Sequence, residues 1–127
     1  MQLINAHTQD VIVAAVEMAD TRESRRRGLL GRDGLDAGSA LVISPCFSIH
    51  TAFMRFAIDV VFLDRHGLVL RVVPGLRPWR LAIAVGARQV VELPAGALEA
   101  HPVLVGDKLY LRSGEGSAAH AAVVAAA

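Results

Sequence analysis

The feature that most constrains the fold is a pair of apolar runs around a glycine-bearing turn near the middle of the chain. Ile58–Asp64 and Leu68–Val73 are rich in valine, leucine and isoleucine, and Arg65–Gly67 separates them. Runs of this length and composition, joined by a short turn, are typical of paired antiparallel strands. The sequence therefore predicts a β-hairpin in this region.

Further short apolar runs predict further strands. The expected strands cover Val11–Ala19, Ala40–Ile43, Leu81–Val85, Gln89–Leu93 and Lys108–Arg112. Glycine and proline residues stand between them, as expected for turns. Many short strands at close spacing predict a mainly β fold of sandwich, jelly-roll or barrel type rather than a parallel α/β sheet.

One short helix is expected near residues 21–30. Asp20 or Thr21 offers an N-cap, and Glu23 stands three residues after Asp20, as in a capping box. A glycine ends the segment. We therefore expect a single short helix after the first predicted strand.

The length of 127 residues fits one domain. We expect a mainly β domain over residues 1–112 and a flexible tail, rich in alanine and glycine, over residues 113–127. The 13 basic residues nearly balance the 12 acidic ones, so the chain lacks the overall field that attracts nucleic acid. Any charge-driven function must therefore come from local clustering.

No apolar run approaches the roughly 18 residues that a membrane helix requires, so we expect no membrane insertion. The N-terminus lacks the basic start, apolar middle and small-residue cleavage site of a secretory signal. The single cysteine, Cys46, cannot form an internal disulfide, which fits a reducing compartment. We therefore expect the chain in the cytoplasm.

The signatures of common enzyme classes are missing from the sequence, including the G-x-S-x-G elbow, the H-E-x-x-H motif and the Walker loop. Cys46 and His50 stand close together with Asp59 nearby, and such side chains bind zinc. The other histidines are scattered singly. We therefore expect no metal site, and the sequence does not identify a cofactor.

Asp59 is the most informative polar residue, because it interrupts an apolar run where an unpaired carboxylate would be costly. Arg55 lies roughly 13 Å away along an extended strand, so His50, Thr51 or an arginine of the helix are better partners. A carboxylate beside an imidazole suits acid–base chemistry. The alternative is a buried polar network that fixes strand register.

Five arginines cluster around the expected helix. They are Arg22, Arg25, Arg26, Arg27 and Arg32. A planar guanidinium suits recognition of carboxylate or phosphate. Acidic residues in the same stretch nearly cancel this charge, so we interpret the cluster chiefly as a solvated helix face.

Several segments together carry a family resemblance. They are Arg26–Arg32, Ser48–Asp64, Val90–Gly96 and Gly106–Asp107, in this order. The combination, over roughly residues 11–112, resembles the bacterial and archaeal domain of unknown function 192 (DUF-192) family. The resemblance implies a small, mainly β sandwich or jelly roll with a short helix after the early strand, and no established activity. It also implies exported relatives, and we expect a bacterial source.

The matching positions have no assigned roles in that family. They are Gly28, Gly31, Arg32, Met54, Asp59, Asp64, Glu92, Gly96, Gly106 and Asp107. The chain departs from many relatives at Phe53, where they have tryptophan, at Arg55-Phe56, where they have asparagine and threonine, and at Ala57, where proline is common. These departures argue against one ligand specificity shared across the family.

Our leading hypothesis is a binding or accessory domain for a small polar ligand or a peptide, because polar groups that converge in an apolar wall form such sites. The candidate ligand-binding residues are His50, Thr51, Met54, Arg55, Asp59 and Arg32. One alternative is a hydrolase-like enzyme with His50 as general base oriented by Asp59, with or without a metal at Cys46 and His50. Another is a structural or interaction module that acts through sheet edges or the tail.

Overall fold

A computed structural model describes residues 1–113 and 121–123 of the chain. The strands are β1 (Gln2–Asn5), β2 (Val11–Val13), β3 (Ala15–Ala19), β4 (Ser39–Ile43), β5 (Ser48–His50), β6 (Ile58–Leu63), β7 (Val69–Leu76), β8 (Leu81–Ile83), β9 (Gln89–Pro94), β10 (Leu109–Arg112) and β11 (Ala121–Val123). The helices are α1 (Arg22–Arg27) and α2 (Ala97–Ala100). Apart from residue 113 and β11, the predicted flexible tail lies outside the described residues.

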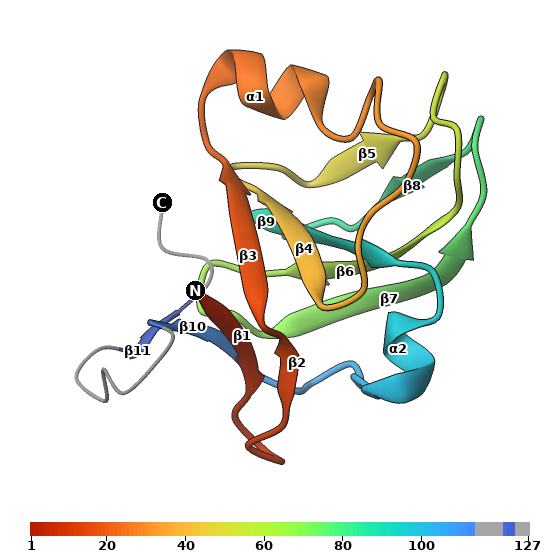
Figure 1. Cartoon of the computed structure of the whole chain (residues 1–127). Helices are drawn as coiled ribbons and strands as arrows, with labels where there is room; N and C mark the ends of the chain where they lie inside the picture. Colours follow the sequence, from red (N-terminus) through yellow and green to blue (C-terminus); the bar gives the residue numbers. More distant parts are fainter. Residues whose placement is uncertain (114–120, 124–127) are drawn as a thin grey trace.

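The strands form three open sheets (Figure 1). The central sheet has the order β3-β4-β9-β6-β7, a second has the order β11-β10-β1-β2, and β5 pairs with β8 alone. The mainly β class predicted from the sequence is confirmed, and the described strands close no barrel. No described helix is long and apolar enough to cross a membrane.

The central hairpin is confirmed, because β6 and β7 pair antiparallel as the apolar pattern predicted. Two differences stand out elsewhere. The run Val11–Ala19 is not one strand: it breaks at Ala14, with β2 in the four-stranded sheet and β3 beside β4 in the central one. The amides of Ala14 and Ala15 both donate to the carbonyl of Gly38, which fixes the chain where it changes sheets. A second short helix, α2, was not expected.

Both faces of the central sheet are covered, so every residue of β6 is buried. Val61 and Leu63 face a core shared with β1, β2 and β10. Val60 and Phe62 alternate to the other face, where the turn after α1 and the β5–β8 pair complete a second core. In Figure 1, α1 and the β5–β8 pair lie on one side of the central sheet, and α2 lies on the other side.

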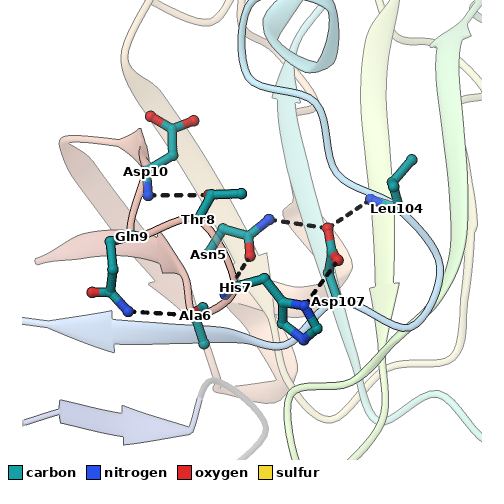
Figure 2. A network of polar contacts seen from close by, with 8 residues as sticks. All are labelled: Asn5, Ala6, His7, Thr8, Gln9, Asp10, Leu104 and Asp107. Atoms are coloured by element: carbon teal, nitrogen blue, oxygen red, sulfur yellow. Dashed lines mark hydrogen bonds and ion pairs between the residues drawn. The ribbon is translucent and has the colours of Figure 1, made fainter.

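A polar network fastens the turn between β1 and β2 to the loop before β10 (Figure 2). Asn5 is buried and donates through Nδ2 to Asp107 Oδ2 at 3.0 Å. The same oxygen accepts from the amide of Leu104 at 2.9 Å, and Asn5 Oδ1 accepts from the amide of His7 at 2.9 Å. These hydrogen bonds join residues of the cluster to one another, so we assign the cluster a structural role.

Candidate functional site

Asp59 is buried in β6, and backbone amides rather than side chains satisfy its carboxylate. Oδ1 accepts a hydrogen bond from Gly75 at 2.8 Å, and Oδ2 accepts from Gly96 at 3.1 Å and from Leu98 at 3.0 Å. Hydrogen bonds to a charged acceptor are among the stronger ones in proteins. Asp59 therefore holds β7 and the start of α2 against β6.

A cavity of about 600 Å³ borders Asp59 on this side of the sheet, against α2 and the loop that follows it. Its walls include Val72, Leu98 and Val103. Both carboxylate oxygens of Asp59 are already occupied by amides. Most of the lining is therefore apolar, and the acid that it adds to Asp59 is Glu99, which is exposed on α2.

Thr51 is fully buried and fastens the loop after β5 to the loop before β8. Its hydroxyl donates to the carbonyl of Arg77 at 2.6 Å and accepts from the amide of Arg80 at 2.8 Å. Its backbone amide donates to the carbonyl of Arg80 at 2.8 Å, and its carbonyl accepts from the amide of Trp79 at 3.0 Å. The expected contact between Thr51 and Asp59 therefore does not form.

The two arginines of the candidate set form surface ion pairs. Arg55 Nη1 lies 2.6 Å from Asp33 Oδ1, and Arg32 Nη2 lies 2.8 Å from Glu17 Oε2. Exposed pairs of this kind contribute about 0–1 kcal/mol to stability. Neither arginine joins His50 in a common site.

A pocket of about 310 Å³ lies between α1 and β5, and it brings part of the candidate set together. His50 and Met54 line it. Cys46 and Glu92 also line it, and Arg25–Arg27 of α1 form the opposite wall. In Figure 1, α1 and β5 lie above the central sheet, on the same side of it.

Glu92 provides the buried acid of this pocket. It is only 3% exposed, and Oε1 has no hydrogen-bond partner among the described residues. The strand register places it between Leu41 of β4 and Val60 of β6, so its neighbours in the sheet are aliphatic. Burial raises the pKa of Glu92 to about 7, although the positive charge of Arg32 opposes the shift. Near neutral pH the carboxyl group is therefore present in both protonated and ionised forms.

Cys46 and His50 add two further reactive groups. The Cys46 thiol is half-buried and donates to the carbonyl of Ser48 at 3.0 Å. Burial raises the pKa of this thiol, and the negative charge of Glu92 adds to the shift while Arg25 opposes it. His50 is exposed on β5. Within residues 1–113 and 121–123, no group of three or more His, Cys, Asp or Glu side chains is placed to hold a metal ion.

The local sequence of α1 shapes the pocket. Thr21 and Ser24 form a capping box, each accepting from the other's amide at 3.0 Å, so Ser24 takes the part that the sequence suggested for Glu23. Gly28 ends the helix with a φ of +48°, and a Cβ there would stand 4.0 Å from Glu92 Oε1. A glycine at this position therefore leaves space in front of the carboxyl group.

Glu92, like Asp59, is a carboxyl group within a predicted strand, because it stands between apolar residues in Gln89–Leu93. Sequence reasoning treated Glu92 only as a family match and missed it as a site residue. A charged residue inside a buried strand was the signal that could have found it. The two carboxyl groups differ in their hydrogen bonding, because backbone amides from distant segments donate to Asp59 but not to Glu92.

The open three-sheet fold and this pocket define a class: a small, mainly β protein with a buried acid beneath a short helix. The chain belongs to the DUF192 family, whose model, described as "Uncharacterized ACR", matches residues 3–111. The family resemblance seen in the sequence is thereby confirmed.

Two archaeal proteins illustrate the similarity. The UPF0127 protein of Thermococcus sibiricus is 31% identical over 112 residues, which cover 84% of this chain and 72% of that protein. The UPF0127 protein of Pyrococcus abyssi is 38% identical over 101 residues, which cover 74% of this chain and 83% of that protein. These relatives give no support to the bacterial source expected from the sequence.

Two solved structures share the fold. A Sinorhizobium meliloti protein described as a "putative transcription regulator" has a TM-score of 0.74 at 20% identity, covering 85% of this chain and 88% of that one. A Novosphingobium aromaticivorans protein of unknown function has a TM-score of 0.67 at 20% identity, covering 74% of this chain and 72% of that one. At this identity the likeness concerns the fold alone.

Proposed function

We propose that this protein is a binding domain for a small polar ligand, and that the ligand occupies the pocket between α1 and β5. The observation that supports the proposal is the buried carboxyl group of Glu92, whose Oε1 has no partner within the described part of the chain. An unsatisfied buried polar group costs about 1–3 kcal/mol. A ligand that donates a hydrogen bond to Glu92 removes this cost.

The pocket lining favours particular ligand chemistry. Glu92 calls for a hydroxyl or amine donor, whereas the guanidinium groups of Arg25 and Arg26 favour an anionic group on the same molecule. Met54 supplies apolar contact. The volume of about 310 Å³ lies at the lower end of ligand pockets, which span roughly 300–1,000 Å³, and suits a small molecule or the end of a peptide.

The proposed site differs from the set expected from the sequence. His50 and Met54 stay in it, and Glu92 and Cys46 join them. The proposal involves no nucleic acid. The proposed compartment is the cytoplasm, where reducing conditions keep Cys46 as a thiol.

The test is a thermal-shift screen at pH 7 with small hydroxy acids, amino acids and phosphorylated alcohols as probes. We expect a subset of these probes to raise the Tm of the natural protein and to shift the NMR signals of His50. The variant Glu92→Gln should lose both responses, while Glu99→Gln, which alters an exposed acid on α2, should keep them. Equal responses from both variants, or no response from the natural protein, would contradict the proposal.

The pKa of Glu92 favours a second candidate, hydrolase-like chemistry, because a carboxyl group that titrates near pH 7 suits general acid–base catalysis. Asp59 cannot orient His50 for this purpose, because the two residues line different cavities. Glu92 takes that role in this candidate. Hydrolysis of esters or phosphoesters whose rate changes near pH 7, and which Glu92→Gln does not catalyse, would support this candidate. If the natural protein hydrolyses these substrates no faster than Glu92→Gln does, the candidate is excluded.

A further inference from the structure

Residues 81–85, which comprise β8 and the two residues after it, present their larger side chains to solvent. Ala82 and Ala84 are buried, whereas Leu81 and Val85 are 72% and 92% exposed and Ile83 is also exposed. In a strand with one covered face, the larger apolar residues normally point inward. The outer face of β8 is therefore an apolar row that this chain leaves uncovered.

An aromatic pair stands next to this row in the chain, because Trp79 precedes Leu81 by two residues. The rings of Phe53 and Trp79 lie with centroids 4.5 Å apart and planes tilted by 60°, and both side chains are largely exposed. Both residues have left-handed backbone conformations, with φ values of +65° and +64°. Two bulky residues in this strained region are uncommon, and such strain is typical of functional sites.

The loops that bear these rings are firmly joined. The hydroxyl of Thr51 donates to the carbonyl of Arg77 and accepts from the amide of Arg80. The backbone of Thr51 also bonds to Arg80 and to the amide of Trp79. Strained conformations persist when surrounding contacts determine them in this way. The aromatic pair is therefore held in place before any partner arrives, which lowers the entropy lost on binding.

Charge is distributed unevenly around this surface. Segments 37–58 and 65–91, which supply β5, β8 and both loops, contain no aspartate or glutamate, although the whole chain has 12 acidic residues. Arg77, Arg80 and Arg88 are exposed in the second segment. None of the three makes an ion pair with any residue that the structure describes. The apolar row is therefore bordered by unneutralised positive charge.

We propose that this tip surface docks onto the surface of an anionic phospholipid bilayer. The tip surface consists of Phe53, Trp79, Leu81, Ile83 and Val85, flanked by Arg77 and Arg80. Aromatic rings bind at the level of the lipid headgroups, and arginines reach anionic phosphates while their aliphatic stems cover apolar surface. Contact at this depth requires no membrane-spanning element.

The geometry favours a bilayer over an added peptide strand. A peptide that extends the sheet needs free backbone groups along β8. The carbonyl of Ile83 already accepts from Arg71 Nη1 at 2.6 Å. The aromatic pair also lies at the end of two loops, where it contacts a broad surface more readily than a narrow chain.

Docking would also place the ligand pocket near the membrane. The register of β5 and β8 sets His50 opposite Leu81 and Ser48 opposite Ile83, so these four side chains share one face. His50 and Ser48 line the pocket. The apolar row therefore begins where the pocket wall ends.

The experiment uses Trp79, which is the single tryptophan of the chain, as its reporter. The protein is titrated with vesicles of phosphatidylcholine alone and with vesicles that also contain phosphatidylglycerol. With the anionic vesicles we expect the emission of Trp79 to shift to shorter wavelength, to be quenched by brominated lipid, and to revert at high salt. Phosphatidylcholine alone should produce a much smaller change.

Matched variants separate the tip surface from the rest of the molecule. Arg77→Glu with Arg80→Glu should weaken partitioning onto anionic vesicles by about tenfold or more, because each basic residue at the surface adds to binding. Phe53→Ser should reduce quenching by brominated lipid. Lys108→Glu with Arg65→Glu makes the same charge change before β7 and beside β10, and should leave partitioning nearly unchanged.

Several results would overturn the proposal. Unchanged Trp79 emission with anionic vesicles would do so, as would equal partitioning of the two double variants, each confirmed as folded by circular dichroism. A concentration-dependent dimer in sedimentation equilibrium that buries Trp79 would instead assign this surface to a second copy of the chain. Saturable binding of an acidic peptide that shifts the emission of Trp79, with no response to either kind of vesicle, would assign the surface to a protein partner.

Discussion

Asp59 and Glu92 lie on adjacent strands of the central sheet, one residue out of register, and their side chains point to opposite faces. Asp59 pairs with Leu93, and Glu92 pairs with Val60, so the two carboxyl groups are separated by the sheet itself. Three backbone amides donate to the carboxylate of Asp59, whereas Oε1 of Glu92 has no partner among the described residues. One acid therefore supports the architecture, and the other is available to a ligand.

Asp59→Ala should destabilise the protein by about 2–4 kcal/mol, because it removes a charged acceptor from three backbone amides. Urea unfolding at pH 7 measures the loss. Asp59→Asn retains one acceptor oxygen and should lose less. Neither change should alter the response of His50 to pocket ligands, and a loss below about 1 kcal/mol in the alanine variant would refute the structural role.

Glu92 should make the protein less stable as the pH rises from about 5 to 8. Its pKa is about 7 in the folded state, whereas the ordinary pKa of a glutamate is 4.5, so the folded state binds the proton more tightly than the unfolded state across this interval. The contribution of this group to stability is greatest below pH 4.5, and about 3 kcal/mol is lost as the pH rises from 4.5 through 7. Urea unfolding at several pH values measures the change.

The control for this pH dependence is Glu92→Gln, which keeps the size of the side chain but cannot ionise. It should flatten the decline in stability between pH 5 and 8 and should be more stable than the natural protein at pH 8. Glu99→Gln, at an exposed position, should leave the decline intact. A natural protein that grows more stable over this interval, with no difference in Glu92→Gln, would show that Glu92 titrates normally.

Thr51→Val should loosen the two loops around the aromatic pair, because it removes the hydroxyl that bonds to Arg77 and Arg80. We expect faster hydrogen exchange at the amide of Arg80 and a stability loss of about 1–3 kcal/mol. Thr51→Ser keeps the hydroxyl and should restore protection of that amide. Slow exchange in both variants would mean that the backbone bonds alone hold the loops.

Cys46 should react slowly with iodoacetamide at pH 8, because burial raises the pKa of its thiol and only the thiolate reacts. Glu92→Gln removes a neighbouring negative charge and should speed alkylation of the folded protein. Mass spectrometry against time measures the rate. An unchanged rate in Glu92→Gln would indicate that Glu92 exerts no charge effect on the thiol.

The sequence predicted the parts of this fold that depend on local pattern. The β6–β7 hairpin follows from apolar runs and a turn that are neighbours in the chain. The same pattern gave no sign of β5, whose Ser48–His50 segment is too short and polar, or of the break at Ala14. The strand β5 depends on pairing with β8, and the break at Ala14 depends on the carbonyl of Gly38. Both contacts form only in the folded chain.

The candidate site was predicted only in part for the same reason. The cost of burying Asp59 was correctly inferred, but its partners, Gly75, Gly96 and Leu98, lie 16 to 39 residues away in sequence. Backbone amides leave no residue-type signal, so no inspection of side chains could identify them. Glu92 shows the opposite case, because nothing in the sequence indicates that its Oε1 lacks a partner.

The pairing of β1 with β10 sets the order in which this protein can assemble during synthesis. Gln2 lies opposite Arg112, so β1 leaves the ribosome long before its partner β10. Until β10 is available, β1 can pair only with β2, and its other edge stays unpaired. Contacts between residues this far apart in sequence slow folding, so we expect the four-stranded sheet to complete late. The hydrogen bond between Asn5 and Asp107 then stabilises it.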